Sequence, residues 1–362
     1  MNHTVLFKAF AKACSFTVLS LSSAVLLSTG IIGYTLLSNA QPIDIEEQLA
    51  IPSQNRFERV LRNEADSLLQ LGGQAQRRGN LTEAIAHWLQ ALEIYEEIGD
   101  FEALNLTYDY LGLTYARLKD YKKAEDALRR RLGMARSLRD LQGQIYGLNN
   151  LGTVLLQKGD FEAAQKTFAE ALEITRSVKN RQGEGLTLSN LGLAAFQMGK
   201  YAEAIEYYEA ALVLRPRSVN AQGSVNTRNN MGDAYRAVNS PRKALGYYRA
   251  ALIIAEDKGD LSNQFRGLRG LVLSYKDLQQ YSPALKYLNQ LLVLAQEQGH
   301  LRAQLVSLRL YAEIYKTTGD LFKAKNFYER AIALAAAIGD TKEETFLRND
   351  LAQIIYEGRG ID

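Results

Sequence analysis

Two stretches of the chain decide its fold: residues 148–172, LNNLGTVLLQKGDFEAAQKTFAEAL, and residues 188–212, LSNLGLAAFQMGKYAEAIEYYEAAL. Each has apolar residues spaced by three and four, which is typical of an amphipathic helix. In each, the pattern runs into a Gly-Asp or Gly-Lys pair and restarts after an aromatic residue, so one helix ends and another begins there. The two stretches start 40 residues apart (188 − 148), which indicates two copies of one helical pair.

The same period runs through most of the chain. An alanine recurs every 40 residues, at Ala84, Ala124, Ala164, Ala204, Ala244, Ala284 and Ala324. A second column is apolar throughout, at Leu71, Leu111, Leu151, Leu191, Met231, Leu271, Tyr311 and Leu351. A period of this length indicates one small unit that buries its apolar face against its neighbours, so the sequence predicts an all-α solenoid with an extended surface.

The repeated residues resemble the tetratricopeptide repeat family, whose pattern places Leu-Gly in the first helix and alanines around an aromatic residue in the second. Here that pattern reads Leu191-Gly192, then Ala204, Tyr208 and Ala211. The early tryptophan position of the family holds leucine instead, at Leu148, Leu188 and Leu268, and the late proline appears only as Pro216. The longer period is similar to that of kinesin light chains and Pins-type polarity adaptors.

The resemblance covers roughly residues 60–357 and implies a right-handed solenoid. We expect an array over 56–357, with about seven helix pairs over 61–340 and a capping helix at 341–357. Residues 358–362 would form a short tail. The resemblance also implies that the first helix of each pair lines a concave groove.

The first 40 residues differ from the array. They combine Lys8 and Lys12, an apolar run over 13–37, and small residues at Ser38 and Ala40, which are the three parts of a secretory signal peptide. The apolar run is also long enough to span a bilayer, so an uncleaved signal anchor is the alternative. Either interpretation predicts export to a periplasm, thylakoid lumen or cell envelope. Residues 41–55 then form a polar leader.

The candidate ligand-binding residues follow from a helical projection of the third copy. With a rotation of about 100° per residue, Leu151 and Leu155 lie on the packing side with Leu148, and the amides lie on the opposite side. Across copies, the amides form two columns of candidate peptide-binding residues, Asn149 with Asn229 and Asn150 with Asn190 and Asn230. An asparagine amide donates and accepts together, so stacked amides suit the backbone of an extended peptide. The alternative is that these amides bond between neighbouring helices.

Charge is uneven along the first helices. Residues 141–157 contain no charged side chain, whereas the later copies carry the remaining candidates, Arg266, Arg269 and Arg309. If these arginines face the groove, its C-terminal part suits a peptide with acidic residues or a free carboxylate. The alternative is that they form surface ion pairs, which contribute about 0–1 kcal/mol each.

Other functional classes find little support in the sequence. Without Lys8 and Lys12, 41 basic residues face 40 acidic ones, a balance that gives no support for nucleic-acid binding. No catalytic motif, cofactor motif or metal-ligand spacing is present, and the single cysteine, Cys14, lies in the expected signal segment. We therefore expect no catalytic residue, no cofactor and no metal.

The functional hypothesis is a non-enzymatic scaffold or assembly factor that binds extended protein segments in the groove. The alternative is a ligand sensor whose curvature changes when a short peptide or cell-wall fragment binds.

Overall fold

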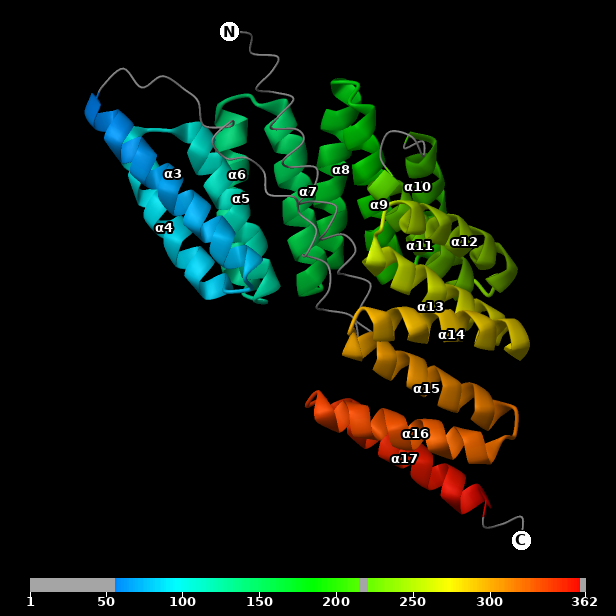
Figure 1. Ribbon diagram of the computed structural model, residues 1–362. Coiled ribbons are helices and arrows are strands. Elements are labelled where there is room, and N and C mark those ends of the chain that lie inside the picture. Colours follow the sequence, from blue (N-terminus) through cyan, green and yellow to red (C-terminus); the bar gives the residue numbers. More distant parts are fainter. Residues whose placement is uncertain (1–55, 215–220, 359–362) are drawn as a thin grey trace. The chain divides into compact units, whose positions relative to one another are not determined.

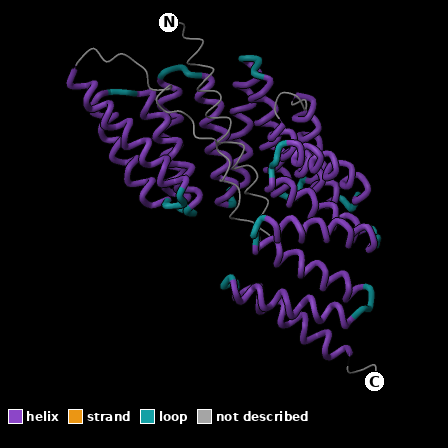
Figure 2. Tube along the Cα trace, viewed as in Figure 1, coloured by secondary structure: helices purple, strands orange, loops and turns teal. Residues whose placement is uncertain are grey.

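The computed structural model describes residues 56–214 and 221–358 of the chain. Within these residues every regular element is an α-helix, as Figure 2 shows, and the prediction of an all-α fold is confirmed. The expected signal and leader segments, residues 1–55, lie outside the described part. The described helices divide into two compact units, an N-terminal unit and a C-terminal unit.

The N-terminal unit consists of four helix pairs (Figure 1). These are α3 (Arg56–Arg77) with α4 (Leu81–Ile98), α5 (Phe101–Arg117) with α6 (Tyr121–Ser137), α7 (Leu141–Lys158) with α8 (Phe161–Ser177), and α9 (Arg181–Gln197) with α10 (Tyr201–Leu214).

The C-terminal unit consists of three further pairs and one last helix. These are α11 (Ala221–Ala237) with α12 (Pro241–Asp257), α13 (Leu261–Asp277) with α14 (Tyr281–Glu297), α15 (Leu301–Thr317) with α16 (Leu321–Ala337), and α17 (Thr341–Gly358). None of the described helices in either unit is long and apolar enough to cross a membrane.

The helix boundaries follow from short polar and glycine-containing turns. Most first helices begin after an Asp or Asn whose side chain caps the helix, as where Asp140 accepts from the backbone N–H of Gly143 at 2.8 Å. His300 takes this role for α15 and accepts from Ala303 through Nδ1 at 3.1 Å. Many helices end at a left-handed residue, for example Gly159 with φ 92°.

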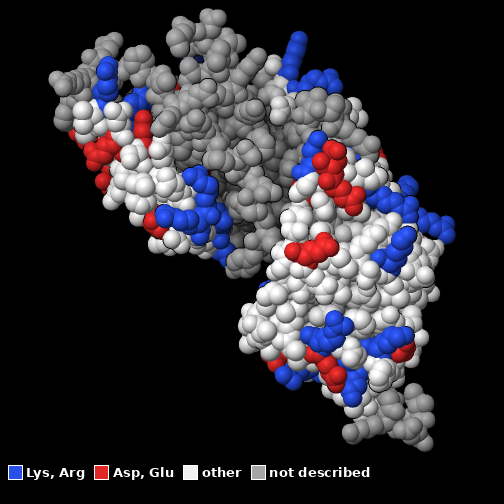
Figure 3. Space-filling view, viewed as in Figure 1, with Lys and Arg blue, Asp and Glu red and all other residues white. Residues whose placement is uncertain are grey.

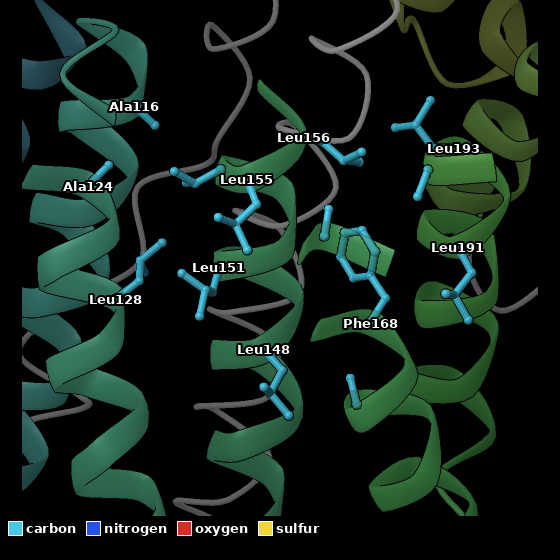
Figure 4. Packing of buried hydrophobic residues seen from close by; sticks show 14 of the residues in the cluster. Ala116, Ala124, Leu128, Leu148, Leu151, Leu155, Leu156, Phe168, Leu191 and Leu193 are labelled. Carbon is cyan, nitrogen blue, oxygen red and sulfur yellow. The ribbon is translucent and has the colours of Figure 1, made fainter. Parts of the chain in front are cut away.

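The core forms where small and large residues of the repeat meet. In α7, a Cβ added to Gly152 would lie 2.4 Å from Cε1 of Phe168, so only glycine allows the phenyl ring to pack this closely. Phe168 is fully buried beside Leu151 and Leu191, which come from the helices on either side (Figure 4). Burying a side chain of this size contributes about 1.5–3 kcal/mol. The repeated Leu-Gly and aromatic positions thus fix how first and second helices pack.

Candidate functional site

The asparagine columns of the N-terminal unit bond to one another between repeats. Asn190 of α9 donates through Nδ2 to Oδ1 of Asn149 in α7 at 2.8 Å. Asn149 in turn donates to the carbonyl of Ile145 at 2.8 Å and to Oγ1 of Thr187 at 3.0 Å. The two first helices are therefore joined by a chain of side-chain amide and hydroxyl bonds.

Asp109 of α5 extends this network and was not among the residues predicted from the sequence. Its carboxylate accepts from Asn150 at 3.2 Å and from Nε of Arg131 in α6 at 2.8 Å. Asp109 and Arg131 are 5% and 1% exposed, so this is a buried ion pair. Asp109 lies one period before Asn149, so the 40-residue alignment already contained the signal that could have identified it.

The expectation of free amides on the open side of the first helices is corrected by these contacts. Asn149, Asn150 and Asn190 are each 2% exposed or less. In the C-terminal unit, Asn229 donates to Oδ1 of Asn263 at 2.9 Å, and Asn230 accepts from Arg266 at 2.6 Å. A helical projection sees one helix alone, whereas polar groups buried by neighbouring helices must find partners among them. Peptide contact by these asparagines stays a prediction.

Some capacity for hydrogen bonding remains in the two columns. Oδ1 of Asn150 and Oδ1 of Asn229 are buried acceptors without a hydrogen-bond partner in the structure, and so is Oδ1 of Asn105 in α5. Asn105 has no counterpart in the asparagine columns, so the repeat pattern did not indicate it. A buried polar atom without a partner costs about 1–3 kcal/mol, so a ligand N–H that reached it would remove that cost.

Two of the three candidate arginines, Arg266 and Arg309, lie in ion pairs. Arg266 of α13 contacts Oδ2 of Asp233 in α11 at 2.6 Å. Asp233 also accepts from the hydroxyl of Tyr248, and burial together with this carboxylate raises the pKa of Tyr248 well above its ordinary value. Tyr248 therefore stays protonated and donates to Asp233.

Arg309 of α15 has two acidic neighbours. It contacts Glu343 of α17 at 2.8 Å and Glu313 of its own helix at 3.4 Å. Lys276 of α13 also pairs with Glu313. Figure 3 shows acidic and basic side chains beside one another over the last helices. The expected cationic surface is therefore neutralised at Arg266 and Arg309.

Arg269 of α13 differs from these two arginines. It is half-buried, and it forms neither an ion pair nor a hydrogen bond with any residue in the described parts of the chain. Burial lowers the pKa of its guanidinium, attraction to Asp233 opposes that shift, and repulsion from Arg309 adds to it. The guanidinium nevertheless stays charged at neutral pH. Arg269 is thus a partly desolvated cation with unused hydrogen-bond donors.

The possible metal ligands among the described residues are not clustered. Among the residues that the structure describes, no group of three or more His, Cys, Asp or Glu side chains could hold a metal ion.

A family model described as tetratricopeptide repeat matches residues 63–137, 144–217 and 184–257, and a second model of that name matches 310–338. The chain therefore belongs to the tetratricopeptide repeat family, a fold of protein-interaction scaffolds. No curated protein sequence matches it.

Solved structures of similar fold include three that cover most of the chain. Apo RapI is 16% identical, with a TM-score of 0.59, and the match covers 76% of this chain and 99% of that one. A STAND ATPase with a tetratricopeptide repeat sensor from Pyrococcus horikoshii is 18% identical, with a TM-score of 0.62 over 80% of this chain and 46% of that one. The Rap conjugation gene regulator of plasmid pLS20, in complex with the Phr* peptide, is 16% identical, with a TM-score of 0.55 over 82% and 80%. At these low identities, the structural matches show a shared fold alone.

Proposed function

We propose that this chain is a non-enzymatic scaffold that binds extended segments of other proteins along its first helices. The observation that carries the proposal is the contrast between Arg269, which makes no hydrogen bond or ion pair within the described residues, and its neighbours Arg266 and Arg309, which pair with acidic side chains. A half-buried guanidinium of this kind is stabilised by a carboxylate that binds to it from outside.

The ligand that fits best is an extended segment with an acidic side chain or a free C-terminal carboxylate. A planar guanidinium can bind a carboxylate through two parallel hydrogen bonds, which selects it over a neutral group. Arg269 would therefore set the charge preference of the site.

The test is a selection from a random peptide library, run on the natural chain and on Arg269→Glu. We expect the natural chain to enrich peptides that carry acidic residues or a free C-terminus, and Arg269→Glu to lose that enrichment. The control is Arg242→Glu, which makes the same charge change on the exposed side of α12. Equal enrichment by all three chains contradicts the role of Arg269, and no enrichment by the natural chain contradicts peptide binding.

A second candidate is a sensor that changes its curvature when a short peptide or cell-wall fragment binds. Its support is that structures of similar fold include two Rap proteins in complex with the Phr* peptide and with the competence and sporulation factor. A sensor predicts that a small ligand changes the compactness of the whole chain in small-angle scattering. A scaffold predicts capture of folded partners without that change.

The proposed location is the far side of a membrane, to which residues 1–40 would direct the array as a signal peptide or an anchor. The support is the basic start, the apolar run and the small residues before Gln41. Sequencing of the mature protein tests both forms: a new N-terminus at Gln41 indicates cleavage, and a retained N-terminus in the membrane fraction indicates an anchor. A retained N-terminus in the soluble fraction contradicts export.

A further inference from the structure

The second helices of the first two repeats carry opposite charge. Helix α4 contains four glutamates and no lysine or arginine, a net charge of −4. Helix α6 contains six basic and two acidic residues, which is 6 − 2 = +4. They are neighbours because both pack on α5, where Tyr108 donates to Glu96 of α4 at 3.0 Å and the apolar cluster joins Ala91 of α4 to Ala127 of α6.

The two helices interact through Tyr108, which contacts Glu96 of α4 and Arg130 of α6. Arg129 pairs with Glu125 of its own helix at 2.6 Å, and Arg136 pairs with Glu170 of α8 at 2.6 Å. No ion pair joins α4 to α6 within the described residues, where Glu93 and Glu97 are exposed and make no ion pair. Arg131 of α6 is buried with Asp109, so the surface presents the four exposed glutamates of α4 beside five exposed basic side chains of α6.

We propose that this α4/α6 surface binds the same surface of a second copy of the chain. An isologous dimer requires a patch that is complementary to itself, and adjacent helices of opposite charge form such a patch. A two-fold axis parallel to the helices places α4 of each copy against α6 of the other. An acidic protein or an anionic membrane would suit α6 but would be repelled by the four glutamates of α4.

The 40-residue period gives the register of this contact. Rotation about a two-fold axis parallel to the helices does not change the position of a residue along the helix axis. A residue of α4 therefore faces the residue 40 positions later in α6 of the second copy. Glu93 then faces Gly133, with Arg129 one turn before it and Arg136 one turn after it. Each Glu93 carboxylate would lie between two arginines of the other copy.

Gly133 is compatible with this register. It is exposed in the middle of α6, where glycine lowers helix stability relative to alanine. A Cβ added there would meet no atom within 4 Å, so packing within the chain does not require glycine at this position. Without a side chain, it leaves room for Glu93 of the second copy to reach the arginines.

Co-purification of two differently tagged full-length copies tests the proposal. We expect natural copies to co-purify, and each of two charge-reversed variants, Glu93→Arg/Glu97→Arg and Arg129→Glu/Arg136→Glu, to lose co-purification with itself. Mixing the two variants restores opposite charge across the contact, so we expect the mixed pair to co-purify. That rescue also shows that both variants fold.

The matched control for the glutamate variant is Glu173→Arg/Glu206→Arg, which makes the same change in net charge on exposed positions of α8 and α10 and should leave co-purification unchanged. Natural copies that fail to co-purify overturn the proposal. Association that persists within both reversed variants, or a mixed pair that does not associate, also overturns it. The proposal is also overturned if natural copies do not associate and the Arg129→Glu/Arg136→Glu variant loses binding to anionic vesicles, because the surface then binds a membrane.

Discussion

Asn190 donates to Oδ1 of Asn149 at 2.8 Å across 41 residues of sequence, and Asn150 donates to Asp109 at 3.2 Å across the same separation. Forty-one residues are one repeat plus one position. Each bond therefore joins neighbouring first helices along the same diagonal, and polar groups align the repeats of the N-terminal unit alongside the apolar core. Such bonds are specific about register in a way that apolar contacts are not.

The Asn149–Asn190 bond predicts a coupled loss of stability. Asn149→Ala should lower the free energy of unfolding by about 1–3 kcal/mol, because Thr187 and Asn190 lose a buried partner. With Asn190→Ala, a double-mutant cycle should give a coupling of about 0.5–3 kcal/mol. Urea denaturation followed by the fluorescence of the single tryptophan, Trp88, measures both. Asn63→Ala, at an exposed position of α3, should change the free energy by less than about 0.5 kcal/mol.

The buried pair of Arg131 and Asp109 predicts an asymmetry between single and double substitution. Arg131→Ala should cost about 3–5 kcal/mol, because it leaves the Asp109 carboxylate buried without its cation. Arg131→Met with Asp109→Leu should recover most of that loss, since no uncompensated charge remains. Thermal denaturation followed by circular dichroism measures the series. A double variant that is no more stable than the single one would contradict this account.

Two glycines of the C-terminal unit should respond oppositely to alanine. A Cβ at Gly232 would lie 2.6 Å from the ring of Tyr248, so Gly232→Ala should cost about 1–3 kcal/mol. Gly246 is exposed within α12 with no atom within 4 Å of an added Cβ, so Gly246→Ala should stabilise by about 0.5–1 kcal/mol. Urea denaturation followed by circular dichroism gives the sign of each change, and equal effects would contradict the packing account.

A turn with a left-handed residue offers a stabilising substitution. Gln279 has φ 57°, where the equivalent positions Gly159 and Gly199 carry glycine. The left-handed conformation costs L-residues about 1–2 kcal/mol, and glycine avoids this cost but loses more conformational entropy on folding. Gln279→Gly should therefore raise the free energy of unfolding by about 0.5–1 kcal/mol. Lys258→Gly is the control: with φ −97° there is no strain to relieve, and stability should fall. Thermal midpoints compare the two variants.

Asp66 predicts a pH-dependent difference. Burial raises the pKa of its carboxyl above the ordinary value of 3.8, although a hydrogen bond from the Tyr95 hydroxyl at 2.6 Å acts in the opposite direction. A pKa raised by folding means that Asp66 favours the folded state most below that ordinary value, and that this contribution is lost as the pH rises through the folded pKa.

Asp66→Asn keeps an acceptor for Tyr95 and removes the titration. The stability of this variant relative to the natural chain should therefore increase between acidic and neutral pH. Urea midpoints followed by Trp88 fluorescence across that range measure the difference. A difference that does not change with pH, or that decreases, would contradict the assigned shift.

The sequence by itself determined the repeat, the helix pairs and the residues that pack them. Its 40-residue columns predicted that each unit buries its apolar face against its neighbours, because in a repeat each position has equivalent neighbours in every copy. Gly152 against Phe168 and Gly232 against Tyr248 show one such contact recurring in both units.

Only the tertiary structure decided which polar residues keep free hydrogen-bonding capacity. Asn149 and Arg266 looked available along one helix, yet each finds its partner on a neighbouring helix, and Asp109 entered the network through Arg131 of a second helix. Arg269 keeps its donors because Asp233, the acidic residue that attracts it, is paired with Arg266 instead. Side-chain pairing depends on what the adjacent repeat brings to within about 3 Å, and helical periodicity contains no information about that distance.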